Sequence, residues 1–196
     1  MQNLKHNLQL YTEISSCQIC RLCQNQPPIY DKKPKSQIFW VGLSAVRFDD
    51  FTDKLPLDPC TKSGALIQEI EAPLSGKIAF YKTNLVKCPP LKDNGKIRYP
   101  NKKEMKDCCA HLEKEIEQHS PSIIFLLGKQ VASFVLKKHS IDNFSLSNSF
   151  EYDSFTINRI KYVPVHHPSY VLIYKRKHLQ DYINNIRKLS KRTLMN

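Results

Sequence analysis

Cysteine is the residue type in this chain whose spacing most clearly suits metal chemistry. Cys17 and Cys20 form a C-x-x-C pair in a polar N-terminal stretch, Cys88 precedes two prolines, and Cys108 and Cys109 fall near the start of a helical pattern. The total of seven cysteines is odd, which does not suit a set of structural disulfides. Four thiolates in a tetrahedral shell suit either zinc or an iron–sulfur cluster, and local spacing does not choose between them. The sequence therefore predicts a metal or cluster site if the N-terminal stretch folds back over the sheet edge.

A role in the hydrophobic core is the alternative for Cys109 and Cys60. Cys109 shares the helical spacing of Met105, Leu112 and Ile116, and free cysteines often pack as small apolar residues. The C-x-x-C pair has less core to join, because the stretch around it is polar. Ligation is therefore the favoured hypothesis for that pair, whereas Cys109 keeps both interpretations.

Two polar side chains stand where predicted strands end. Asn84 lies inside the stretch YKTNLVKCPP (residues 81–90), although an amide does not favour a strand and two prolines stop strand pairing just afterwards. His167 follows another strand pattern and precedes a proline. An asparagine at a strand end is more often a turn or cap residue, and His166 with His167 also suits a surface pair. The functional hypothesis is that Asn84 and His167 bind a ligand beyond the strands.

The chain alternates strand and helix patterns, which supply the elements that must position these side chains. This order predicts a three-layer α/β/α fold around a central, mainly parallel, four-stranded sheet. Ligands bind such sheets beyond the carboxyl ends of the strands, so the loops 42–47, 84–90 and 166–170 are the candidates. The expected strands cover residues 36–42, 78–86, 122–127 and 162–165, the last within a hairpin over 150–165, and the expected helices cover 64–72, 102–118 and 129 to about 138.

Length and charge limit the class of protein. A chain of 196 residues suits one domain with appendages, namely an arm over residues 1–36 with the first cysteines, an α/β domain over 37–175, and a basic helix over 176–196 that packs on the domain. The formal charge is 30 − 18 = +12, which favours a polyanionic partner, with nucleic acid ahead of an anionic membrane surface. No apolar run approaches the ~20 residues of a membrane span, and the N-terminus lacks a signal-peptide pattern. We therefore expect a cytoplasmic monomer that binds no membrane.

Several motifs follow one another along the chain, namely CQICRLC, a strand ending in VG, YKTNLVKCPP, a helix with E-x-x-x-C-x-x-x-L, a strand ending in LLG, and HPSY. Their order resembles that of the iron–sulfur uracil-DNA glycosylases, the family-four branch of the uracil-DNA glycosylase superfamily. The likeness covers roughly residues 15–175. It implies base recognition by Asn84 and a catalytic role for His167. It also implies a structural [4Fe–4S] cluster, with zinc the weaker alternative, on the four cysteines Cys17, Cys20, Cys88 and Cys108, while Cys23 and Cys109 are spare.

Three segments depart from the family pattern. Where family four has Gly-Glu-x-Pro-Gly, this chain has the sequence GLSAV over residues 42–46, which is closer to the family-five glycosylases and their wider range of damaged bases. The Pro-Phe-x-Gly segment, whose phenylalanine stacks on the base, has become PLDPC over residues 56–60. The loop between Cys88 and Glu104 is longer than usual. The water-activating group, the stacking residue and the target base therefore stay open.

A glycosylase must flip a nucleotide out of the duplex, read the edge of its base and stabilise the base as it leaves as an anion. The amide of Asn84 complements N3–H and O4 of uracil, but not the reversed pattern of cytosine. His167 is predicted to donate to the pyrimidine O2, a contribution of ~3 kcal/mol per donor, and backbone amides after Gly42 are candidates for the same oxygen. For water, Asp49 and Asp50 are the nearest acids after Gly42, with Asp49 the predicted activating group and Ser44 the predicted orienting group.

The remaining site predictions concern the pocket wall and the phosphates. Leu43, Leu57 and Cys60 are expected to contact the substrate together with Gly42 and Asn84. Because helix N-termini and basic side chains bind phosphates, the predicted DNA contacts are Lys62, Ser63, Ser169, Lys175 and Arg176. No lysine has the setting of a Schiff-base nucleophile, so base removal without strand cleavage is expected.

The sequence thus predicts a monofunctional DNA glycosylase that hydrolyses the N-glycosidic bond of uracil or of a 5-substituted pyrimidine. Base excision repair and defence against modified viral DNA are the two settings considered. The alternative is a non-catalytic nucleic-acid-binding relative, which Leu43 in place of the family glutamate favours. A zinc-bound scaffold is a third and weaker hypothesis.

Overall fold

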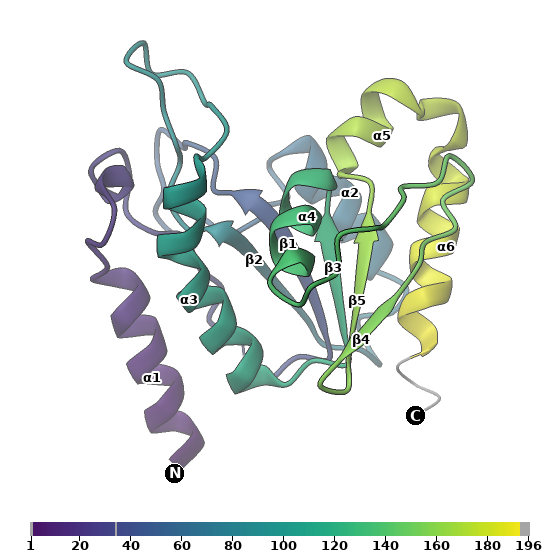
Figure 1. The fold of residues 1–196 in the computed structure, drawn as a ribbon, viewed down its shortest axis with the longest axis horizontal. Helices are drawn as coiled ribbons and strands as arrows, with labels where there is room; N and C mark the ends of the chain where they lie inside the picture. The colour runs from purple at the N-terminus through teal and green to yellow at the C-terminus, as the bar shows by residue number, and fades with distance from the viewer. Residues whose placement is uncertain (1, 34, 193–196) are drawn as a thin grey trace.

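A computed structural model describes residues 2–33 and 35–192 and shows a five-stranded sheet between layers of helices (Figure 1). The strand order is β2-β1-β3-β5-β4. Four strands run parallel, namely β1 (Ile38–Ser44), β2 (Phe80–Val86), β3 (Ile123–Leu127) and β5 (Ile160–Val165), and β4 (Phe155–Ile157) is antiparallel to β5. The predicted mainly parallel α/β fold is confirmed. The sheet has five strands rather than four, because the first arm of the predicted hairpin pairs with β5 as a short edge strand.

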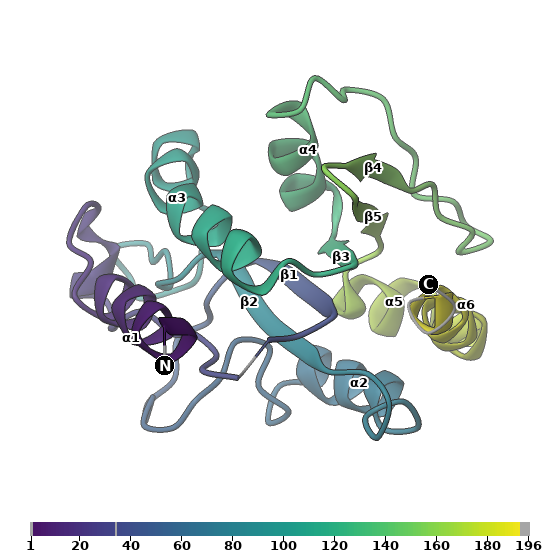
Figure 2. The same ribbon diagram turned by 90° about the horizontal axis from the view of Figure 1, so that it is seen from below.

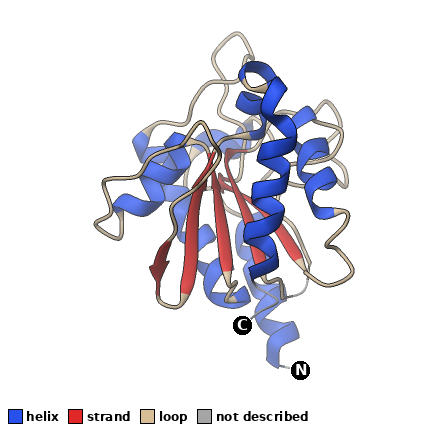
Figure 3. Ribbon diagram, turned by 90° about the vertical axis from the view of Figure 1, so that its right-hand side faces the viewer, coloured by secondary structure: helices blue, strands red, loops and turns tan. Residues whose placement is uncertain are grey.

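Helices cover both faces of the sheet, as Figures 2 and 3 show. On one face, α3 (Lys102–His119) and α4 (Lys129–Lys137) pack on the strands, and α1 (Gln2–Ser15) packs on α3. On the other face lie α2 (Lys62–Glu71), α5 (Pro168–Tyr174) and α6 (Leu179–Lys191). Two single turns, η1 (Arg21–Gln24) and η2 (Arg176–His178), complete the elements described. None of the described helices is long and apolar enough to cross a membrane.

Residues of β1 show why the sheet is buried on both sides. Successive side chains of a strand point to opposite faces, so Ile38 and Trp40 enter the core beneath α2 while Phe39 and Val41 enter the core beneath α3. All four are fully buried. Parallel strands covered by helices on both faces read as continuous apolar runs for this reason.

Capping residues fix where the helices next to those strand ends begin. Asn101 and Glu104 form a capping box at the start of α3, in which each side chain accepts from the other residue's backbone N–H. Thr61 caps α2 by accepting from the backbone N–H of Gly64. His167 caps α5, with Pro168 at the first helical position. A polar side chain therefore stands at the start of each of these helices.

The predicted appendages pack against the sheet domain. Leu22 of η1 joins the core beneath α3, and Tyr182, Ile183 and Ile186 of α6 join the core on the opposite face. The basic C-terminal helix begins at Leu179 rather than 176, and the last predicted residues, 193–196, lie outside the described chain. The division into arm, domain and tail stays a prediction.

Candidate active site

A cavity of about 1050 Å³ opens at the carboxyl ends of the parallel strands. Each of the three predicted loops contributes to its wall. The strand ends supply Leu43 and Ser44 from β1, Asn84 from β2, Leu127 from β3, and His166 and His167 after β5. The cavity therefore lies where ligands bind in open parallel α/β sheets.

Asn84 lies directly opposite Gly42 in the register of β2 and β1. Only 2% of Asn84 is exposed, and no hydrogen bond to its side-chain amide exists among the described residues. A Cβ placed on Gly42 would lie 2.2 Å from Oδ1 of Asn84 and 3.4 Å from a methyl carbon of Leu57. The glycine thus makes the space that the amide occupies, and the amide keeps its donor and acceptor for a ligand.

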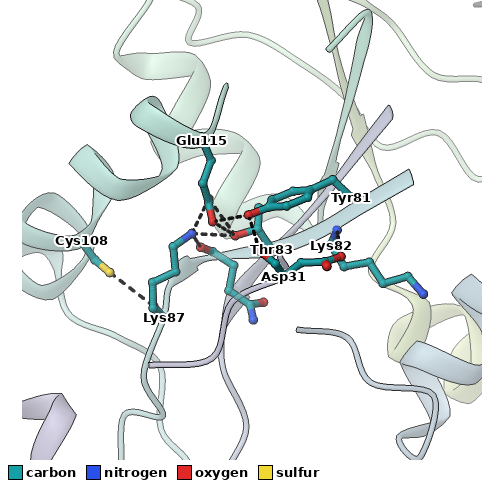
Figure 4. Close-up of polar contacts among 8 residues, drawn as sticks. Asp31, Tyr81, Lys82, Thr83, Lys87, Cys108 and Glu115 are labelled. Atoms are coloured by element: carbon teal, nitrogen blue, oxygen red, sulfur yellow. Dashed lines mark hydrogen bonds and ion pairs between the residues drawn. The ribbon is translucent and has the colours of Figure 1, made fainter. Parts of the chain in front are cut away.

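The backbone of Asn84 is held by a buried ion pair between Lys87 and Glu115, which Figure 4 shows. Nζ of Lys87 donates to the Asn84 carbonyl at 2.7 Å, to Oγ1 of Thr83 at 2.6 Å and to Oε2 of Glu115 at 2.6 Å. Glu115 also accepts from the hydroxyls of Thr83 and Tyr81, at 2.9 and 3.0 Å. Both charged side chains are buried, so the pair is stable only because these hydrogen bonds satisfy it. The network ties the end of β2 to the middle of α3.

His167 is held in one tautomer by the start of α5. Its Nδ1 accepts from the backbone N–H of Ser169 at 3.2 Å and lies 2.8 Å from Oγ of the same serine. Burial lowers the pKa of His167, so the ring is neutral at pH 7 and carries its proton on Nε2. Cβ of His167 lies 3.3 Å from where Gly128, with φ of 94°, would carry a Cβ. A neutral imidazole with a free N–H donor therefore lines the cavity with Asn84.

His166 has a structural environment, although it also lines the cavity. Its Nδ1 lies 2.9 Å from the hydroxyl of Tyr152, and its ring stacks on Tyr170 with centroids 5.2 Å apart. The hydroxyl of Tyr182 donates to the His166 carbonyl at 3.0 Å. These contacts fix the strand end from which His167 projects.

Five cysteines converge beside β2 and α3, around a second, small cavity. They come from the N-terminal arm, from the loop after β2 and from α3, and the wall also includes Pro28 and His111. Burial and the neighbouring thiols raise the pKa of Cys88, and burial raises the pKa of Cys108 to about 11 although Lys87 opposes it. Cys88 and Cys108 are buried thiols that a bound cation would stabilise as thiolates, and the other three cysteines of the cavity are half-buried beside them. The five are Cys17, Cys20, Cys23, Cys88 and Cys108.

Within the described ranges, no group of three cysteine, histidine or acidic side chains is arranged as a metal site. The small cavity does, however, separate the two adjacent cysteines of α3. Cys109 lies outside this cavity, with its sulfur 3.4 Å from Nζ of Lys138, while Sγ of Cys108 accepts from the backbone N–H of Lys87 at 3.3 Å. Cys108 is therefore the residue of this pair that the fold places with the other thiols.

The segment that follows the first cysteines holds both loops of the large cavity. The side chain of Asn25 donates to the Pro89 carbonyl at 2.9 Å. Gln26 accepts from the backbone N–H of Phe48 at 2.8 Å and donates to the Val46 carbonyl at 3.3 Å. Anchoring of the arm at the cysteines therefore also positions the loops that follow β1 and β2.

The structure brings some of the predicted site residues to the cavity and not others. Leu43, Ser44, Leu57, Asn84, Ser63, His167 and Ser169 line it, and Gly42 lies behind Asn84. The predicted contacts that do not line it are Asp49, Cys60, Lys62, Lys175 and Arg176. Asp49 and Cys60 are exposed in the segment that joins β1 to α2, so neither takes part in the cavity wall as predicted.

Asp58 is the acidic residue among those that line the cavity, and it was not among the predicted site residues. Its Oδ1 accepts from the backbone N–H of Cys60 at 2.9 Å, and its Oδ2 from that of Leu55 at 3.3 Å. Burial raises the pKa of Asp58, but the hydrogen bonds from Cys60 and Leu55 outweigh it and leave the pKa below its usual value. The sequence feature that could have indicated Asp58 is its position in PLDPC, the segment that replaces the family's stacking residue.

These features define an α/β protein with a cavity at the carboxyl edge of a mainly parallel sheet. The family model of the uracil DNA glycosylase superfamily matches residues 25–189, and the chain belongs to this superfamily. The type-4 uracil-DNA glycosylase of Archaeoglobus fulgidus is 25% identical over 187 residues, which are 90% of this chain and 88% of that protein. The type-4 uracil-DNA glycosylase of Sulfurisphaera tokodaii is 27% identical over 91% of this chain and 82% of its own.

A solved structure supports the fold. The crystal structure of wild-type Pedobacter heparinus SMUG2 superposes with a TM-score of 0.59 at 17% sequence identity, over 85% of this chain and 80% of that one. Together, the matches confirm the superfamily and the α/β architecture that the motifs predicted.

Proposed function

We propose that this protein is a monofunctional DNA glycosylase that hydrolyses the N-glycosidic bond of uracil in DNA. The observation that carries the proposal is the pairing, in one cavity, of an asparagine amide available to a ligand with a neutral histidine that has a free N–H. The names of the type-4 relatives support it. The formal charge of +12 supports a DNA partner, and we extend the proposal to a cytoplasmic, monomeric enzyme.

Each step of the reaction has a residue in this proposal. The Asn84 amide accepts from N3–H of the flipped base and donates to its O4. The Nε2–H of His167 donates a hydrogen bond to O2 as negative charge develops on that oxygen. A neutral imidazole that carries its proton on Nε2 can make this bond in the protonation state it already has. Loss of one such donor typically costs about 3 kcal/mol of transition-state stabilisation. The backbone that follows Gly42 provides further donors beside the same oxygen.

Water activation is assigned to Asp58 rather than Asp49. Asp58 belongs to the cavity wall, and its low pKa keeps the carboxylate charged, so it orients water and stabilises positive charge on the sugar. Ser44 lines the same cavity and is proposed to hold that water by a hydrogen bond. Asp58→Asn is expected to slow base release strongly, and Asp49→Asn to leave it near wild type.

We propose that the pocket also accepts pyrimidines with a substituent at C5. A cavity of about 1050 Å³ exceeds what one pyrimidine fills, and Leu57 stands where family four has a flat phenylalanine. Such a substrate is compatible with base excision repair and with defence against modified viral DNA. The Asn84→Asp variant is expected to shift the preference from uracil-type edges toward cytosine-type edges.

The proposed cofactor is a [4Fe–4S] cluster held by Cys17, Cys20, Cys88 and Cys108. When bound, it supplies a covalent link between the N-terminal arm, the loop after β2 and α3. Through that link it holds Asn25 and Gln26 where they support the loops of the large cavity. The assigned role is therefore structural.

Base release from DNA tests the proposal directly. Oligonucleotides, single- and double-stranded, would carry uracil, hydroxymethyluracil, hydroxymethylcytosine or its glucosylated form, and the free base would be measured by mass spectrometry. We expect the wild-type protein to release a base and His167→Ala to release none. The base that is released identifies the substrate. DNA binding without release from any of these substrates would instead support the non-catalytic relative.

A further inference from the structure

The loop between Cys88 and α3 forms a small hairpin over residues 91–99. Leu91 and Ile97 pair as an isolated antiparallel bridge, and Gly95 turns the chain with φ of 75°. The hairpin projects beyond the carboxyl ends of the strands, in teal at the upper left of Figure 1. Ile97 is 46% exposed and Tyr99 is 71% exposed, and both line the large cavity.

Exposed apolar side chains concentrate around this cavity. Of the eight large hydrophobic residues that are exposed within residues 9–33 and 35–192, six line it: Val46, Ile97, Tyr99, Tyr170, Ile173 and Tyr174. They come from opposite walls, because the first three belong to the loops after β1 and β2 and the last three to α5 (Figure 1). Apolar groups gathered at one concave site mark a binding surface rather than scattered surface residues.

Arg98 holds the hairpin in place before any ligand arrives. Its guanidinium donates to both carboxylate oxygens of Glu104, at 2.6 and 2.8 Å, and to the Tyr99 carbonyl at 3.0 Å. The bond to Arg98 lowers the pKa of Glu104, so the pair stays charged. Glu104 in turn belongs to the capping box of α3. A preorganised backbone at Tyr99 loses little conformational entropy on binding.

Basic residues accompany the aromatic ones. Lys92 and Lys96 lie on the hairpin with one acid, Asp93, and Lys92 lines the cavity. Nη1 of Arg47 lies 3.3 Å from where Gly95 would carry a Cβ, so a further cation lies against the turn. Aromatic rings beside cations are the combination that binds unpaired nucleic-acid strands, since rings stack on bases and cations contact phosphates.

We propose that the hairpin over residues 91–99 is a second DNA-binding element, which grips the unpaired strand beside the flipped nucleotide. Tyr99 stacks on the neighbouring base, while Lys92, Lys96 and Arg47 contact the phosphates of that strand. The inference rests on the proposed function, because it takes DNA to be the ligand of the cavity. Its consequence is that single-stranded or locally unpaired DNA binds more tightly than a fully paired duplex.

The test measures DNA binding by fluorescence anisotropy in the full chain carrying His167→Ala, so that no base is released. The probes are a labelled single-stranded oligonucleotide with one uracil and the same strand in a duplex, each at several salt concentrations. Tyr99→Ala is expected to weaken single-strand binding about 5- to 100-fold, with less effect on the duplex and an unchanged salt slope. Tyr99→Trp, which retains a stacking ring, is expected to bind like the parent.

The charged residues give an independent result. Lys92→Ala with Lys96→Ala is expected to reduce the salt slope for the single strand by about 1.4, or about 0.7 for each phosphate that no longer has a lysine beside it. Lys77→Ala removes one exposed charge just before β2, at the opposite end of the sheet, and serves as the matched control with no change in slope.

Three outcomes would overturn the inference. These are Tyr99→Ala binding single strands like the parent, equal weakening of single-strand and duplex binding, or an unchanged salt slope in the double lysine variant. Thermal melting of each variant shows whether the fold persists. If the parent protein binds neither probe, the proposed function itself is overturned. This result differs from the three above, in which the parent binds DNA and only the effect of the variants is missing.

Discussion

Gly42 and Asn84 face each other across β1 and β2, and a Cβ on the glycine would come within 2.2 Å of the asparagine Oδ1. The position of the amide in the cavity therefore depends on the absence of a side chain on the neighbouring strand. Because both residues are in regular parallel strands, the constraint is steric and does not depend on a special glycine conformation.

The first prediction concerns this contact. Gly42→Ala should displace the Asn84 side chain and reduce base release at least tenfold, because misplacement by about an ångström has effects of this size or larger. The measurement is single-turnover base release, with thermal melting to confirm folding. Gly76→Ala is the control, since a Cβ there meets nothing within 4 Å. Equal activity of both variants would show that Asn84 does not need its observed position.

A second prediction concerns the buried pair Lys87 and Glu115. Lys87→Met leaves an unpaired carboxylate in the core and should reduce the free energy of unfolding by about 3–5 kcal/mol. The double variant Lys87→Met with Glu115→Leu should be destabilised by less than the sum of the two single effects, because it leaves no uncompensated charge. Urea denaturation measures all three.

The control for this cycle is Lys103→Met, because the Lys103 side chain is 79% exposed where it pairs with Asp107 on α3. Its destabilisation should stay below about 1 kcal/mol. Since Lys87 also donates to the Asn84 carbonyl, a folded double variant should still release base more slowly than wild type. A double variant with full activity would remove Lys87 from the support of Asn84.

The third prediction separates adjacent cysteines. Cys108→Ser should abolish the brown colour and visible absorbance of a bound iron–sulfur cluster, because Cys108 lies with the other thiols of the small cavity. Cys109→Ser should retain the colour, since its sulfur contacts Lys138 instead. Iron and acid-labile sulfide analysis checks both. Zinc bound in place of iron in the wild-type protein would contradict the cluster assignment.

The fourth prediction is a pH dependence of stability that originates at His119. Only 1% of this residue is exposed, its ring packs against both Phe39 and Tyr81, and neither ring nitrogen has a hydrogen-bond partner among the described residues. Burial lowers the pKa of His119 to about 4. Between pH 6.5 and 4 the unfolded chain therefore binds a proton that the folded chain does not, so stability falls as the pH falls through this window.

His119→Phe removes the imidazole that takes up this proton in the unfolded chain. The melting temperature of the variant should therefore fall less between pH 7 and pH 5 than that of the wild type. Part of the decline should persist, because burial also lowers the pKa of His111 and His166. Replacement of the exposed His139 by Gln provides the control and should leave the decline unchanged. An unchanged decline in His119→Phe would mean that this imidazole is protonated in the folded protein.

Most of the sheet could be predicted from sequence, because strands buried on both faces leave continuous apolar runs such as Ile38–Val41. The hairpin over residues 150–165 was also predicted, but not that its first arm, β4, is a fifth strand of the sheet, since Phe155–Ile157 is only partly buried and gains its structure by pairing with β5. The order of motifs was also sufficient to predict the superfamily, which the family match confirms.

The sequence by itself determined which residues have the right chemistry, namely Asn84 and His167 at strand ends and the cysteines of the arm, loop and helix. Their spacing along parallel strands required that the strand ends meet at one edge. Only the tertiary structure decided which acid reached that edge, Asp58 rather than Asp49, and which of Cys108 and Cys109 joined the thiols. The reason is that loop paths and helix rotation depend on contacts between segments far apart in sequence, such as Gln26 with Phe48 and Lys87 with Glu115. No local pattern encodes those contacts.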